Sequence, residues 1–201
     1  AVHVEQSEDV RVEHLLFARP VAGGGSFGLS ASLLNLPPVK AMTEDVRGNF
    51  AGAGPEQAAY QYRAAVGFGQ SLAAVERLAA LGPLFRDGFF GGSLGVLGQS
   101  LAGERAHAVS VDLGYLYEEA GSGRSVGLAV RQIGMPAAGS PLPVTGQTGV
   151  AQAFGEFLAE ADVLTASDDA MRVSAGLEWR LAVGASSFAL RGGYQHSFAS
   201  A

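Results

Sequence analysis

Hydrophobic and polar residues alternate along most of this chain. The clearest alternation lies in residues 106–134, where Val109, Val111 and Leu113 share one side of the first half, and Ala108 and Ser110 share the other. Side chains on one face of a β-strand recur every two residues. This stretch therefore predicts two strands joined by a turn at 119–123, in which Leu116 breaks the pattern by falling on the small-residue side.

Further alternating segments predict an all-β chain of about ten strands, each about ten residues long, which exceeds the five or six residues typical of soluble sheets. They lie at 10–19, 26–36, 58–70, 89–101, 143–154, 157–165, 170–181 and 187–196, with a fragment at 2–4. In 10–19, the pattern places Val12 and Leu16 on the apolar side and Glu13 and Arg19 on the polar side.

Two segments depart from the alternation. Residues 37–57 contain two adjacent prolines and several glycines, and they predict a long polar loop. Residues 71–81 carry Leu72, Val75 and Leu78 at three-residue spacing before Gly82 and Pro83, which predicts a short amphipathic helix. This helix is expected to be a connector packed on an apolar surface, with a plug or gate as the alternative.

Charged residues indicate which face of the strands meets water. Charged residues make up 16% of the chain, which contains 29 glycines and a single lysine. A water-facing surface made of Gly, Ala and Ser would be unusual. The pattern favours a transmembrane antiparallel up-and-down β-barrel with its apolar face in lipid and a small, polar face inside, over a soluble β-sheet protein. The residues expected to line the interior are Arg63, Asp112, Arg131, Glu160, Asp162, Arg172, Glu178, Arg180 and Arg191.

Composition excludes several classes of function. A net charge of −6 without a basic cluster argues against a nucleic-acid partner. The chain has no cysteine, and no apolar run approaches the roughly 20 residues of a membrane-spanning helix. Tyrosines near strand ends and Trp179 are expected in aromatic girdles at the membrane interfaces. The chain, 1–201, is expected to be one domain of a processed or incomplete protein, because no initiating Met is present.

Several segments together resemble successive strands of the PorV/PorQ family of outer-membrane proteins, relatives of the FadL-type barrels. They are HLLFARPVAGGGSFGLSASLLNL, VSVDLGYLY, SVGLAVRQIG followed by Pro-Leu-Pro, RVSAGLEWRL and FALRGGYQ. The resemblance implies a 14-strand barrel in the outer membrane of a Gram-negative bacterium. The family's N-terminal Asn-Pro-Ala turn and its last strands have no counterpart here, so the chain is expected to be an internal part of the barrel.

Two functions follow from this resemblance. One is a docking or scaffold barrel associated with protein secretion, which contacts other protein subunits through the loop 37–57. The residues expected to make that contact are Lys40, Glu44, Asp45, Arg47 and Asn49. The other is a FadL-like transporter of small hydrophobic molecules. An apolar pocket inside the barrel would favour the transporter, whereas a filled interior would favour docking.

Catalysis is not expected. The four histidines lack metal-ligand spacing, so no metal and no cofactor are predicted. Glu160 and Asp162 place two carboxylates on one strand face, and we expect them to form salt bridges with Arg172 or Arg180 rather than to act as acid and base.

Overall fold

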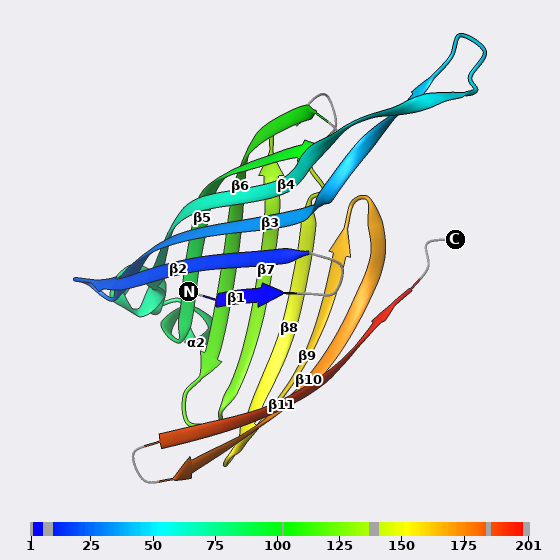
Figure 1. Ribbon diagram of the computed structural model, residues 1–201. Helices are drawn as coiled ribbons and strands as arrows, with labels where there is room; N and C mark the ends of the chain where they lie inside the picture. The colour runs from blue at the N-terminus through cyan, green and yellow to red at the C-terminus, as the bar shows by residue number, and fades with distance from the viewer. Residues whose placement is uncertain (1, 6–9, 102, 137–140, 184–185, 199–201) are drawn as a thin grey trace.

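The chain folds into one antiparallel sheet whose strands follow each other in sequence order (Figure 1). The computed structural model describes residues 2–5, 10–101, 103–136, 141–183 and 186–198. Its strands are β1 (Val2–Glu5), β2 (Arg11–Val21), β3 (Gly25–Glu44), β4 (Phe50–Ser71), β5 (Gly88–Leu101), β6 (Glu104–Glu119), β7 (Arg124–Gly134), β8 (Thr145–Phe154), β9 (Phe157–Ala166), β10 (Asp169–Val183) and β11 (Ser186–Ser197). The predicted all-β, up-and-down arrangement is confirmed. Within the described residues β1 and β11 do not pair, so closure into a barrel stays a prediction.

The connection between β4 and β5 is helical, as predicted, but it consists of three short turns. They are η1 (Leu72–Ala74), α1 (Glu76–Ala79) and α2 (Pro83–Arg86). The helix ends before Gly82, as predicted, but a second short helix, α2, begins at Pro83. Proline is tolerated at the first helical position, where its missing N–H would have no partner.

The predicted loop 37–57 is wrong. Residues 37–44 and 50–57 continue β3 and β4 as a two-stranded ribbon that projects beyond the sheet (Figure 1), and only 45–49 form the turn. The prolines lie where the pairing between β3 and β4 shifts. Pro37 and Pro38 lie between the paired residues Leu36 and Val39, and Pro55 lies opposite the next shift, between Lys40 and Met42. A β-bulge accommodates residues that cannot donate to the ladder, so prolines do not end these strands.

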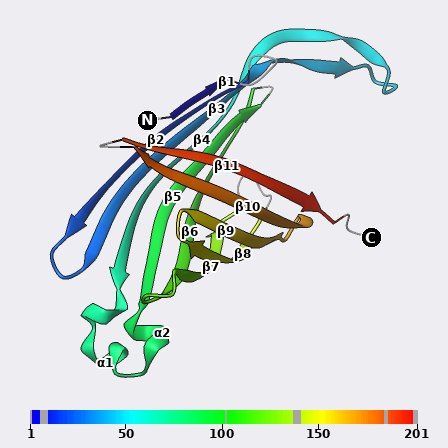
Figure 2. The same ribbon diagram turned by 90° about the horizontal axis from the view of Figure 1, so that it is seen from below.

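The two faces of the sheet differ in side-chain size. One row of paired residues contains Leu29, Val66, Leu94 and Val111, on what we term the outer face. The adjacent row contains Ser30, Ala65, Gly95 and Ser110, on what we term the inner face. Ser110 is 1% exposed and Leu94 is 53% exposed. The sheet curls into a trough (Figure 2), and the burial of small residues such as Ser110 indicates that the inner face is the concave one.

β2 is the strand whose faces the sequence pattern assigns incorrectly. Glu13 pairs with Leu33 and Phe17 pairs with Leu29, so Glu13 and Arg19 share the outer face with Leu15 and Phe17. Apolar residues occupy both parities of this strand, so alternation alone does not separate its faces. Pairing with β3 determines the orientation instead.

Candidate binding groove on the inner face

All of the charged residues predicted to line an interior lie on the inner face. They belong to β4, β6, β7, β9, β10 and β11, and their pairing partners on the neighbouring strands place them on this face. They are Arg63, Asp112, Arg131, Glu160, Asp162, Arg172, Glu178, Arg180 and Arg191. That this face encloses a lumen stays a prediction.

Asp112 connects four strands. Its carboxylate forms an ion pair with Arg63 of β4 and accepts hydrogen bonds from Ser93 Oγ of β5 at 3.1 Å and from the Gln132 backbone N–H of β7 at 2.9 Å. Arg131 and Gln132 together oppose Asp112, which makes a β-bulge with Gln132 at a φ of 61°. A bulge re-aims the backbone locally, and here it directs an N–H towards the carboxylate.

Glu178 is the centre of a second charged cluster. It is buried, and its two carboxylate oxygens pair with Arg180 on the same strand and with Arg191 on β11. Two guanidinium groups on one carboxylate satisfy its acceptor sites. This cluster joins β10 to β11 at one end of the inner face.

The predicted salt bridges of Glu160 and Asp162 are wrong for the residues described. Arg172 pairs with Asp169, and Arg180 pairs with Glu178. Both arginines have an acidic residue within three positions on their own strand, and this local pairing takes precedence over a cross-strand one. Glu160 and Asp162 are therefore left facing the open part of the inner face.

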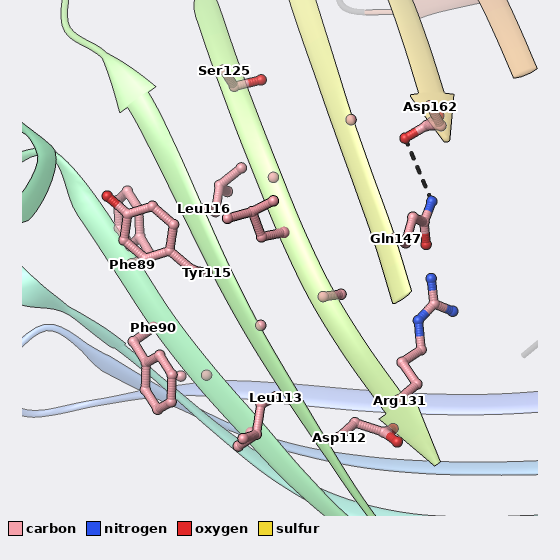
Figure 3. Close-up of a pocket in the computed structure, with 18 of the residues that line it drawn as sticks. Phe89, Phe90, Asp112, Leu113, Tyr115, Leu116, Ser125, Arg131, Gln147 and Asp162 are labelled. Atoms are coloured by element: carbon pink, nitrogen blue, oxygen red, sulfur yellow. Dashed lines mark hydrogen bonds between the residues drawn. The ribbon is translucent and has the colours of Figure 1, made fainter. Parts of the chain in front are cut away.

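A groove of about 610 Å³ lies over the middle of the inner face (Figure 3). One inner-face row contains Phe89, Leu116, Gly127 and Gly149 on four consecutive strands. The two glycines have no side chain, so open space remains beside the rings and methyl groups of Phe89 and Leu116. This arrangement gives the groove an apolar end, which was not predicted. The departure of Leu116 from the alternation was its one sequence signal.

The other end of the groove is polar. Arg131, Gln147 and Asp162 lie along it, and Gln147 Nε2 donates to Asp162 Oδ1 at 3.4 Å (Figure 3). Arg131 also lines an adjacent cavity of about 490 Å³ together with Arg172. The groove can therefore hold a molecule that is apolar at one end and carries hydrogen-bonding groups at the other.

The residues predicted to contact a partner lie on the ribbon of β3 and β4. Asp45 Oδ1 accepts hydrogen bonds from the backbone N–H groups of Arg47 at 2.8 Å and Asn49 at 3.0 Å. These bonds lower the pKa of Asp45, because they stabilise its charged form. Lys40 pairs with Glu56 at 3.1 Å. The side chain of Glu44 lies outside the described part of the structure.

Within the described ranges, no group of three or more His, Cys, Asp or Glu side chains is placed to hold a metal ion. None of the helices described is long and apolar enough to cross a membrane. Comparison of the chain with family models, with curated proteins and with solved structures gives no match.

Proposed function

We propose that this chain is a wall of an outer-membrane β-barrel whose inner face binds and passes small amphipathic molecules. The groove over Gly127 and Gly149 is the observation that carries this proposal. It is apolar at Phe89 and Leu116 and polar at Arg131. A filled inner face would have favoured a scaffold without a ligand, whereas this face is open.

The outer face supports the membrane part of the proposal. Leu94, Leu113, Leu128 and Leu177 are each 42–54% exposed, and no second layer covers them in the part of the chain that the structure describes. A soluble sheet buries its apolar face against another element. Apolar side chains on the outside and polar ones on the inside are the arrangement of a transmembrane barrel.

The height of the outer apolar surface also fits a membrane. On β6 it extends over nine residues from His107 to Tyr115, which corresponds to about 27 Å of strand between the first and the last. At the usual tilt of transmembrane strands this corresponds to a height of about 20 Å, close to the apolar band of such barrels. Tyr62 contacts His107 at one end, and Tyr115 marks the other. Aromatic residues with polar groups favour both membrane interfaces.

The ligand follows from the two ends of the groove. Phe89 and Leu116 would contact a hydrocarbon chain, and Arg131 and Gln147 would donate hydrogen bonds to its carboxyl head. A fatty acid such as laurate has both parts. The resemblance to FadL-type barrels, which implies transport of small hydrophobic molecules, points to the same class of ligand.

Filling the groove tests this function. At Gly127 a new Cβ would meet only Leu116 Cδ1, at 4.0 Å, so Gly127→Leu is expected to fold and occupy the space. We expect it to abolish binding of radiolabelled laurate by the protein in lipid nanodiscs. The matched control is Gly192→Leu on the outer face, where nothing lies within 4 Å. Equal laurate binding by both variants would refute the proposed ligand site.

The projecting ribbon favours docking as a second function. At its end Val46 is fully exposed and Phe50 is largely exposed. Exposed apolar residues on a protruding segment are suited to contact with another protein. Removing residues 38–57 should then leave laurate binding unchanged but prevent surface delivery of exported proteins by cells that depend on this protein. Normal delivery by such cells would exclude docking through the ribbon.

A further inference from the structure

The helical connection between β4 and β5 exposes apolar side chains. None of the residues in η1, α1 and α2 is buried. Leu81 is 65% exposed, Leu84 60%, and Val75 and Phe85 about 40%. A helical connection surrounded by water normally packs its apolar side chains against the protein. So many exposed apolar side chains would therefore be unusual if this connection lay in water.

This connection is attached to the outer face of the sheet. The Tyr115 hydroxyl donates a hydrogen bond to the Leu84 carbonyl oxygen. Tyr115 lies on the outer face between its paired residues Phe90 and Leu128. Gly88 allows this close approach, because a side chain there would collide with the Leu84 carbonyl and the Tyr115 ring. The backbone at Leu84 therefore lies beside the Tyr115 end of the outer apolar surface.

Polar groups of the same connection can remain in water. Arg77 and Arg86 are exposed, and Arg86 forms an ion pair with Asp87 at 2.9 Å. Arginine side chains near a membrane interface extend their charged ends towards water. Exposed leucines and exposed arginines on one short segment are the residue types of a segment that lies in the membrane interface.

We propose that residues 72–86 form an interfacial membrane anchor, with Leu81 and Leu84 inserted at the boundary between lipid headgroups and acyl chains. This proposal rests on the proposed function, in which the outer face meets lipid. The anchor determines how deep the sheet sits, because it fixes the Tyr115 end of the apolar surface at one interface.

Tryptophan fluorescence tests the anchor directly. The chain has one tryptophan, Trp179, so Trp179→Phe gives a silent background. In this background Leu84→Trp, and separately Leu81→Trp, are placed in phosphatidylcholine vesicles that contain lipids brominated at different acyl depths. We expect blue-shifted emission, quenched most strongly by bromines nearest the headgroup. The matched control is Val46→Trp at the tip of the ribbon, which is 104% exposed and should emit as in water without quenching.

A third variant separates the two proposals. Leu113→Trp, in the same background, reports the middle of the outer face. Quenching of this residue by deep bromines, together with unquenched tryptophans at 81 and 84, would overturn the anchor alone. An unquenched tryptophan at 113 would instead overturn the lipid-facing outer surface on which the anchor depends.

Discussion

Tyr62 and His107 are hydrogen-bonded on the outer face, with Tyr62 Oη 2.9 Å from His107 Nδ1, although a third strand runs between them. Gly98 on β5 is paired with both residues. Its missing side chain lets the Tyr62 ring lie across β5, because a Cβ at Gly98 would collide with that ring.

Gly98→Ala should therefore destabilise the protein. The added methyl group displaces the Tyr62 ring and breaks its bond to His107, at a cost of about 1–3 kcal/mol, as for overpacking elsewhere. Urea unfolding in lipid vesicles, followed by circular dichroism, measures this cost. Gly192→Ala is the matched control and should be neutral, since its Cβ meets nothing within 4 Å. A stability unchanged in both would contradict the role assigned to Gly98.

Asp112→Ala should lower the free energy of unfolding by about 1.5–3 kcal/mol, the usual range for hydrogen bonds to charged groups. The substitution removes the acceptor of Arg63, Ser93 and the Gln132 N–H together. Urea unfolding measures the loss. Glu160→Ala on the same face, where no ion pair is described, should change stability by far less. Equal losses in the two variants would show that the Asp112 network contributes nothing specific.

Leu113→Arg places a charge in the middle of the outer face. If this face meets lipid, the cost should be about 2–4 kcal/mol, as at the midplane of other transmembrane barrels. Val173→Arg should behave alike, because Val173 shares this face. Gln147→Arg on the inner face is the control and should cost little. The measurement is the unfolding free energy in vesicles, and a neutral Leu113→Arg would argue against lipid at this position.

The turn at the tip of the ribbon should stay ordered until the pH falls below the ordinary pKa of an aspartate. Hydrogen bonds from the Asn49 and Arg47 backbone N–H groups lower the pKa of Asp45 below its ordinary value of 3.8. A group whose folded-state pKa is lowered stabilises the folded form above its unfolded pKa, and loses that contribution as pH falls through the folded pKa. The turn should thus stay ordered at pH 4. NMR amide shifts of Arg47 and Asn49 followed from pH 6 to pH 2 test this, and a midpoint above 3.8 would contradict it.

Much of the sheet can be predicted from alternation, because a strand with one apolar face repeats every two residues. For this reason, alternation alone predicts the strand at 157–165 and places Glu160 and Asp162 on its correct face. The ribbon was not predicted, since Pro37, Pro38 and Pro55 are ordinarily loop residues, and only the pairing shifts show how strands accommodate them.

The groove depends on register, which a single sequence does not specify. Gly127 and Gly149 are 22 positions apart, and the pairing of β7 with β8 brings them together. Charge pairing depends on register in the same way: Arg63 reaches Asp112 across β5 because Gly95 and Ser93 leave space between them. Alternation identified these residues as sharing a face but not as neighbours.

The strict sequence order of the strands has a consequence for assembly. Each strand from β2 to β10 pairs only with the strands before and after it in the chain. Contacts between segments close in sequence require little loop-closure entropy and are typical of fast folding. Each hairpin can form as soon as its two strands are available, so the sheet can grow progressively at one edge without waiting for a distant part of the polypeptide.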